Sequence, residues 1–405
     1  MKILHTADWH LGQKFIHFDR EQEHILALKW LIEVIKKEKI ELLIVAGDVF
    51  DIGSPPNYAQ KLYYGFFKAL LATGCEHCVV IGGNHDSPSM LNAPKELLDI
   101  FNITVVSAAT DNLQDEIIEI KAKNGDLKMV VAAAPFLRDR DLKSASMEET
   151  AFEKAEQIKL GIYKHYQNIA EICEKYKETP VVATGHLFAK GAQSSDKQDN
   201  IYVGNLENIS AEQFSSVFDY VALGHIHRAQ KLGERENVRY SGSLIPLSFS
   251  EVQDVKSVTI VDFDGKKIKK IDVLDVPVFR KLKLFRGTLD EVKEKISKHN
   301  ARLLLDENEK QLRTWAEIQI ESDTILPNLD LQLTDYVKDM YLDILKLRII
   351  RSQENQSKTV FVHQNLKDMS ELDVFHKRLE SVEESERVGL LESFRELLET
   401  VKSAK

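Results

Sequence analysis

The chain has 405 residues, too many for one ordinary hydrophobic core, so we expect two or three domains. A net charge of −10 argues against a protein that coats nucleic acid through bulk charge, but it leaves room for a local basic patch or for bound metal ions. Three cysteines are too few for a disulfide framework, which fits a reducing compartment. The amino terminus does not resemble a signal peptide, and no apolar run is long enough to span a membrane. We therefore expect a cytoplasmic protein.

Apolar strands and amphipathic helices share the first part of the chain, and their order predicts an α/β domain. The helix predicted at about 58–73 is apolar around more than one face, which indicates either deep burial or contact with a second partner. Cys75 and Cys78 have CxxC spacing but no second pair, so we expect buried thiols and no zinc site. Strands are predicted at about 2–7, 41–46, 78–81, 180–184 and 219–223.

The pattern changes after residue 276. A strand, helix, strand, helix and strand are predicted between 278 and 351, and none of them ends in a polar constellation. Two charged helices with apolar stripes follow, at 371–379 and 384–402. We therefore expect three parts: a main domain at 1–276, a small α+β domain at 277–358 and a helical segment at 359–405.

Five apolar strands each end in a polar motif, and this is the strongest functional signal in the chain. The carboxyl ends of strands in open α/β sheets are where sites form, and side chains two residues apart on an extended chain point the same way. The motifs, in chain order, are Asp8-x-His10, Gly47-Asp48, Gly83-Asn84-His85-Asp86, Gly185-His186 and Gly224-His225-x-His227.

These motifs supply more oxygen and nitrogen donors than one octahedral ion needs, and the set suits two ions that share a carboxylate. Imidazole and oxygen donors without thiolate favour Mn, Fe or Zn over Ca. His85 is then left over to hydrogen-bond a phosphate or to protonate a leaving oxygen, with Asp86 placed to orient it. A single histidine after a strand is more often structural, and Asp48 alone could be a turn cap, so the prediction depends on all five motifs occurring together. The seven donors are Asp8, His10, Asp48, Asn84, His186, His225 and His227.

The order of these motifs resembles the calcineurin-like metallophosphoesterase superfamily. Within it, the stretches 7–12, 47–56 and 81–87 are similar to the SbcD family of bacterial nuclease subunits, strongly over residues 1–275 and more loosely beyond. The resemblance implies an α/β fold of two facing sheets with helices outside. It also implies that Asp8, His10 and His227 hold one metal, that Asp48 bridges, and that Asn84, His186 and His225 hold the second.

For the chemistry, the resemblance implies two divalent ions, with manganese favoured, and His85 as the catalytic histidine supported by Asp86. Archaeal relatives carry a histidine three residues after the bridging aspartate, where this chain has Asp51, so we expect Asp51 to brace the loop.

The same resemblance implies partners. These are DNA, covered by the small domain, and a second copy of the chain, bound through helices near 58–73 and 89–101. A third is an SbcC-type ATPase, because this chain has no phosphate-binding loop for ATP. The terminal helices would dock on that ATPase or pack on the small domain. A basic cluster could meet DNA phosphates or form a solvated face: Lys266, Lys267, Lys269, Lys270, Arg280, Lys281, Lys283 and Arg286.

Three functions are therefore open. The first is a Mn-dependent DNA nuclease, which cuts single strands endonucleolytically and duplex ends 3′ to 5′. The second is another phosphatase or phosphodiesterase of the same superfamily, and the third is a DNA-tethering scaffold with an inert metal site. The small domain and the tail argue against the second function, and the complete donor set argues against the third.

Overall fold

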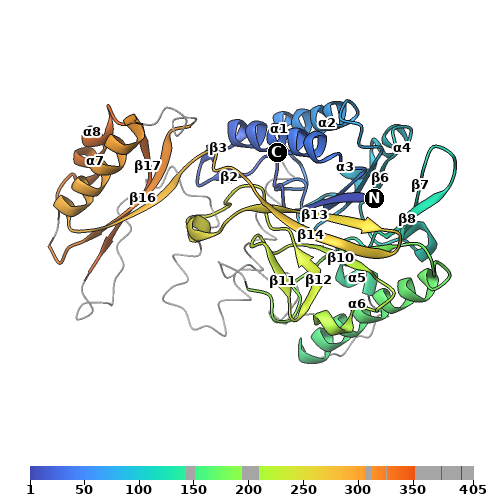
Figure 1. The fold of residues 1–405 in the computed structure, drawn as a ribbon. Helices are drawn as coiled ribbons and strands as arrows, with labels where there is room; N and C mark the ends of the chain where they lie inside the picture. The colour runs from blue at the N-terminus through green and yellow to red at the C-terminus, as the bar shows by residue number, and fades with distance from the viewer. Residues whose placement is uncertain are drawn as a thin grey trace, which may run out of the picture. The chain divides into compact units, whose positions relative to one another are not determined.

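A computed structural model describes residues 1–142, 151–193, 209–305, 312–324 and 326–351, together with Phe375 and Phe394. The chain forms two compact units, Met1–Arg280 and Lys281–Lys405, which we call the large unit and the small unit (Figure 1). The helices predicted at 371–379 and 384–402 lie outside the described residues, apart from the stacked rings of Phe375 and Phe394.

One sheet of the large unit has six strands in the order β14-β13-β1-β4-β5-β6. Its four consecutive strands β1, β4, β5 and β6 pair in parallel, and the β13–β14 hairpin adds to β1 in the antiparallel sense. The strands are β1 (Lys2–Thr6), β4 (Leu42–Ala46), β5 (His77–Ile81), β6 (Ile103–Val106), β13 (Ser257–Asp264) and β14 (Lys267–Asp275).

The second sheet also has six strands, in the order β11-β12-β10-β9-β8-β7. Strands β8, β9, β10 and β12 are parallel, and the two edge strands β7 and β11 pair in the antiparallel sense. The strands are β7 (Ile117–Lys121), β8 (Leu127–Ala132), β9 (Val181–His186), β10 (Tyr220–Gly224), β11 (Gln230–Leu232) and β12 (Arg235–Tyr240).

The two sheets pack face to face, with helices on their outer faces (Figure 1). Ile44 and Val79 of one sheet share a buried cluster with Val131 and Ala222 of the other. Strand β4 is buried along its whole length, as expected for a parallel strand covered on both faces. The predicted α/β sandwich of two sheets flanked by helices is therefore confirmed.

The outer helices attach through apolar stripes. On one side lie α1 (Glu21–Glu38) and α2 (Asn57–Leu70), and on the other lies α6 (Ala151–Cys173). In α2, Tyr63 and Phe67 are buried, whereas Tyr64 is partly exposed. The shorter elements are β2 (Lys14–Phe15), β3 (Phe18–Asp19), α3 (Pro88–Asn92), α4 (Lys95–Asp99), α5 (Asp139–Leu142), and 3₁₀ turns at Leu113–Glu116, Ala211–Gln213 and Phe249–Gln253.

The small unit contains β15 (Leu282–Gly287), α7 (Leu289–Leu305), β16 (Thr314–Glu321), α8 (Leu329–Val337) and β17 (Leu342–Ile350). Both strand pairs are parallel, so this unit is α/β and not the α+β domain expected from the sequence. Thr288 and Glu291 cap α7 by reciprocal backbone bonds of 2.9 and 3.4 Å.

The division between the units falls after Arg280, later than the predicted boundary at 276. Val276 and Phe279 pack into the core of the large unit, and the Arg280 guanidinium donates a hydrogen bond of 2.8 Å to Glu23. These contacts keep the connecting segment with the first unit.

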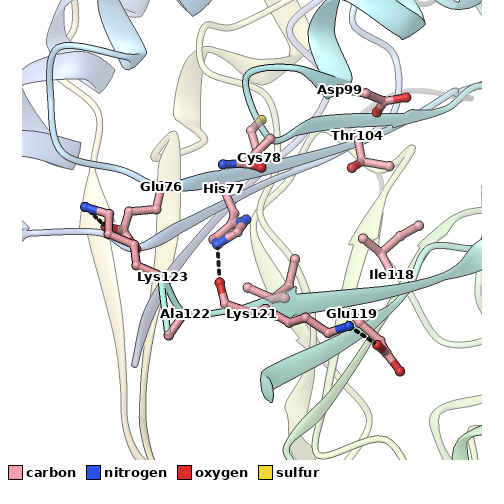
Figure 2. A pocket seen from close by; sticks show the side chains of 12 residues that line it. Glu76, His77, Cys78, Asp99, Thr104, Ile118, Glu119, Lys121, Ala122 and Lys123 are labelled. Carbon is pink, nitrogen blue, oxygen red and sulfur yellow. Dashed lines mark hydrogen bonds and ion pairs between the residues drawn. The ribbon is translucent and has the colours of Figure 1, made fainter. Parts of the chain in front are cut away.

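A pocket of about 510 Å³ opens between β5 and β6 of one sheet and β7 of the other (Figure 2). His77 and the carbonyl oxygen of Lys121 join the two sheets across it at 3.0 Å, and Lys123 pairs with Glu76. His77 begins β5, whereas the predicted site residues follow the other end of that strand. The pocket is therefore not the predicted site.

Among the helices that the structure describes, none combines the length and hydropathy that a membrane span requires.

Candidate metal centre

The site lies where strands of both sheets end. The loops after β1, β4 and β5 come from one sheet, and the ends of β9 and β10 come from the other. The two sets are joined directly, since the backbone N–H of His225 donates to Asp8 Oδ1 at 2.8 Å and His186 Nδ1 lies 2.9 Å from the carbonyl oxygen of Ala46. The five predicted motifs therefore meet in one place.

Four of the predicted ligands have a backbone conformation that L residues rarely adopt. Their φ angles are 52° at Asp8, 45° at His10, 49° at Asp48 and 92° at His225. The loops carrying the first three are joined by backbone bonds of 3.0 Å, from Asp8 to Gly47 and from His10 to Asp48. Such conformations persist only where the surroundings enforce them, and they concentrate at functional sites.

The first ligand group is Asp8, His10 and His227, whose donor atoms lie within 4.8 Å of one another. Asp8 Oδ2 and His10 Nε2 are buried and have no hydrogen-bond partner among the described residues. A buried polar atom without a partner costs roughly 1–3 kcal/mol. A cation between these atoms would remove that cost, so the residues fit a metal ion.

The second group is Asp48, His186 and His225. Asp48 Oδ2 lies 3.1 Å from His186 Nε2 and 3.4 Å from His10 Nε2, so one carboxylate oxygen faces both groups. Asn84 Oδ1 lies 3.0 Å from His186 Nε2 and 2.9 Å from His225 Nδ1, which brings the amide oxygen into the second group. All seven predicted ligand residues are thus assembled around a shared Asp48.

His85 belongs to neither of these groups, but with His10 and Asp51 it forms a third set whose donor atoms lie within 4.8 Å of one another. Its ring is exposed, and its centroid lies 4.9 Å from that of His10. Its Nδ1 is 2.8 Å from the carbonyl oxygen of Asp51. Since a carbonyl only accepts, Nδ1 carries the proton of that bond, and Nε2 is the ring nitrogen that this bond does not use.

The sequence predicted that Asp86 orients the ring of His85, but in the structure the Asp86 carboxylate faces backbone donors instead. Its carboxylate accepts hydrogen bonds from the backbone N–H groups of Val49, Phe50 and Gly83, at 3.1, 2.9 and 2.9 Å. Burial, with the nearby charge of Asp48, raises the pKa of Asp86 to about 6 in spite of these three donors. Asp86 therefore joins the loops after β4 and β5, and the carbonyl of Asp51 takes the place beside His85.

Two further carboxylates support the ligand histidines. Asp51 Oδ1 lies 3.1 Å from His10 Nδ1, and Glu251 Oε1 lies 3.2 Å from His227 Nδ1. Carboxylates of this kind fix the tautomer and orientation of a metal-binding imidazole. Asp51 thus braces the loop as expected, whereas Glu251, in the Phe249–Gln253 turn, carried no signal in the sequence.

The buried ionisable groups of the site strongly shift one another's pKa values. Burial alone would lower the pKa of His10, but the hydrogen bond to Asp51 and the charge of Asp48 raise it to about 9. The pKa of His186 rises to about 9 for a similar reason, because Asp48 outweighs burial. Burial and the charge of His186 lower the pKa of His225 to about 3. Protons on His10 and His186 thus compete with cations for these donors.

The comparisons with known proteins agree with this geometry. Residues 1–229 match the family model described as Calcineurin-like phosphoesterase, so the fold and the site define a phosphoesterase that acts through divalent metal ions. Residues 278–383 match the model described as Type 5 capsule protein repressor C-terminal domain.

The similarity to three curated proteins, each named as a component of the nuclease SbcCD, is more specific. The chain is 36% identical over 406 residues to that of Escherichia coli (strain K12), covering 99% of this chain and 98% of the relative. The Bacillus subtilis (strain 168) protein is 34% identical over 65% of this chain and 66% of its own length. The protein of Rhodobacter capsulatus is 33% identical over 65% of this chain and 67% of its own length. The chain belongs to the SbcD family of calcineurin-like phosphoesterases.

A methyl group at Gly83 should damage the metal centre. A Cβ there would lie 2.1 Å from Asp48 Oδ1 and 2.3 Å from the Asp48 backbone nitrogen, so the shared carboxylate must move. We expect Gly83→Ala to weaken Mn²⁺ binding by roughly 10-fold or more in calorimetry. Gly53→Ala is the control, since its Cβ would meet only Ser87 Cβ at 3.5 Å. Equal affinities of the two variants would contradict the close packing.

The raised histidine pKa values predict how the metal-free protein responds to pH. His10 and His186 have folded-state pKa values of about 9, against 6.5 for an unperturbed histidine. Their stabilising contribution is complete below about pH 6.5 and is lost as pH rises through about 9. The melting temperature in chelator should therefore fall across this range, and the fall should be smaller in His186→Asn. A flat or rising melting temperature would contradict these shifts.

Proposed function

We propose that this protein is a manganese-dependent DNA nuclease that hydrolyses phosphodiesters at a two-metal site. It would cut single strands endonucleolytically and duplex ends in the 3′ to 5′ direction together with an SbcC-type ATPase. Its role would be to process DNA ends and hairpins in repair, recombination and replication. The observation that carries this proposal is the Asp48 carboxylate, which faces two ligand groups at once.

In this proposal Asp8, His10 and His227 would hold one ion, Asn84, His186 and His225 would hold the second, and Asp48 would serve both. The donors are imidazole and oxygen without thiolate, which suits manganese and also iron or zinc. When bound, such ions neutralise phosphoryl oxygens and lower the pKa of water.

The chain's own groups would supply orientation and a proton. The Asp51 carbonyl holds Nδ1 of His85 in its protonated form, so Nε2 is the atom that meets the substrate. When Nε2 also carries a proton, His85 would hydrogen-bond the scissile phosphate or give that proton to the leaving oxygen. Asp86 would act indirectly, because its three backbone bonds hold the loops that carry Asp48 and His85.

Two other functions remain as alternatives. A different phosphatase or phosphodiesterase would use the same ions, and the naming of the relatives as nuclease components favours DNA over other substrates. A DNA-tethering scaffold would have no need of two complete ligand groups around one shared carboxylate.

The basic cluster at the domain junction supports DNA contact only in part. Four of its eight members pair with carboxylates: Lys266 with Asp219, Lys270 with Asp272, Arg280 with Glu23 and Arg286 with Glu321. Phosphate contacts are therefore proposed for Lys267, Lys269 and Lys283.

A homodimer is proposed through α2 and the α3–α4 region. Exposed apolar side chains support it, since Leu97 is 59% and Ile100 74% exposed. Leu71 and Phe101 add to this surface at 46% and 44%. An SbcC-type ATPase would bind through residues 359–405, nearly all of which lie outside the described residues, and the complex would work in the cytoplasm.

We expect His85→Ala to keep both ions and to lose cleavage. Loss of a positioned proton donor typically costs about 10²–10⁴-fold in rate. The assay uses the purified chain with Mn²⁺ or Mg²⁺ on single-stranded DNA, hairpin DNA and p-nitrophenyl phosphodiesters, with Mn²⁺ binding measured in parallel. His77→Ala, at the other end of β5, is the control and should cut like the wild type. Undiminished cutting of single-stranded DNA by His85→Ala would remove His85 from the mechanism.

Truncation after Lys367 should separate cutting from assembly. We expect the shortened chain to retain Mn²⁺-dependent cutting of single-stranded DNA, because the metal centre lies within residues 1–280. Binding to the SbcC-type ATPase should be lost in a co-purification experiment. Retained co-purification would contradict the docking role of the terminal segment.

A further inference from the structure

The segment after strand β8 lies beside the candidate metal centre but supplies none of its predicted ligands. Residues 133–137 are buried and pack in the cores of the sandwich. Thr184 Oγ1 donates to the carbonyl oxygen of Ala134 at 3.1 Å, which ties the segment to β9, the strand that ends in His186. The ring of Phe136 meets that of His186 edge to face, with centroids 6.3 Å apart. The segment is therefore a fixed support at the edge of the centre.

This support holds both ends of the loop that follows β5, residues 82–86, which we call the 82–86 loop. At its first end, the backbone N–H of Phe136 donates to the carbonyl oxygen of Gly82 at 2.9 Å. At its last end, Nη2 of Arg138 donates to the carbonyl oxygen of Asp86 at 3.1 Å. Strand β5 belongs to one sheet and β8 to the other, so both bonds tie the 82–86 loop to the facing sheet.

The contacts of this loop with the candidate centre depend on where its backbone lies. The backbone N–H of His85 donates to Asp48 Oδ1 at 2.9 Å, and Asn84 Oδ1 lies 3.0 Å from His186 Nε2. Nδ1 of His85 reaches the carbonyl oxygen of Asp51 at 2.8 Å. Functional groups have to be held within about 0.5 Å of their working geometry. A small shift of the loop would therefore disturb a predicted ligand and the proposed proton donor together.

We propose that Arg138 is a positioning residue, which fixes the 82–86 loop so that Asn84 holds its ion and His85 faces the phosphodiester. This inference rests on the ligand assignment of the proposed function. A guanidinium suits the task, because it is always charged and donates from N–H groups in a rigid plane. Hydrogen bonds from a charged donor are roughly twice as strong as those between neutral groups. The bond to the Asp86 carbonyl thus secures the end of the loop next to His85.

Arg138 starts from an anchored backbone. Its backbone N–H donates to Asp141 Oδ2 at 2.9 Å, and the preceding Leu137 is 3% exposed. The Arg138 side chain is itself half-buried. A long side chain loses rotamer entropy when it is fixed, and this cost weighs less where the backbone is already held. The base of the side chain is thus fixed by the core and its tip by the 82–86 loop.

The first test measures the loop directly, in the metal-free, full-length protein. We expect Arg138→Met to speed amide hydrogen exchange in a peptide covering residues 82–87 by about 10- to 100-fold, as for the loss of a hydrogen bond to a charged group. The amides of Gly83 and His85 are the reporters, because both donate to carboxylates. Mass spectrometry follows this exchange without metal or cleavage.

The second test measures what the loop does. Mn²⁺ affinity in calorimetry should fall about 10-fold in Arg138→Met, because Asn84 loses its place beside His186. At saturating Mn²⁺, kcat on a p-nitrophenyl phosphodiester should fall about 10- to 100-fold, the effect of a small misplacement of reacting groups. KM should change little, since a positioning residue does not touch the substrate.

Arg235→Met is the matched control. Nη1 of Arg235 also donates to loop carbonyls, those of Ala211 and Phe214 at 3.0 and 2.7 Å, but that loop carries no predicted ligand. The variant should speed exchange around residues 211–214 and leave Mn²⁺ affinity and cleavage unchanged. Arg138→Lys is the second variant, should Arg138→Met fail to fold in a thermal melt. It keeps the charge without the planar fork, so the same quantities should change in the same direction by a smaller factor.

The outcomes separate this inference from the proposed function. Unchanged exchange of residues 82–87 in both Arg138 variants would overturn the positioning role. A raised KM with unchanged kcat would also overturn it, because Arg138 would then be a phosphate contact. A wild-type protein that binds Mn²⁺ but cuts no phosphodiester would contradict the proposed function, while the exchange measurement would still decide whether Arg138 fixes the 82–86 loop.

Discussion

The large unit is organised around one buried carboxylate, that of Asp48, which contacts imidazoles carried by both halves of the sandwich. Burial of a charge is costly unless partners surround it. Here His10 comes from the same sheet as Asp48, and His186 comes from the facing sheet. These histidines hold the pKa of Asp48 well below its usual range in spite of burial. The backbone at Asp48 is left-handed, and a Cβ at Gly47 would collide with His186 while one at Gly83 would collide with Asp48 itself.

Most of the candidate centre could be predicted from the sequence, because its predicted ligands follow the ends of strands. A parallel strand buried on both faces reads as an apolar run, and the residue that follows it lands at a known edge of the sheet. Asp8, Asp48, Asn84, His186 and His225 all follow this rule, and the structure brings them together. The layered α/β architecture could be predicted as well, from the same runs and from the resemblance.

The supporting contacts could not be predicted in the same way. Glu251 lies in a short 3₁₀ turn with no periodic pattern, and its place behind His227 depends on how that turn folds back. Asp86 follows His85 in the chain, yet its carboxylate points to backbone donors of the neighbouring loop. The α+β expectation for the small unit is wrong because a helix between consecutive strands serves as the crossover between parallel strands, so the predicted order of elements favours α/β. The misses at Glu251 and Asp86 concern packing between segments, which local sequence does not encode.

The division of the predicted ligands between two sheets has a consequence for how the protein is made. His225 and His227 follow β10, a strand that pairs with β9 and can join its sheet only after more than half of the chain has left the ribosome. A nascent or truncated chain lacking this strand would lack His225 and His227, one predicted ligand from each group. Two complete ligand groups therefore arise only in a chain that has completed both sheets.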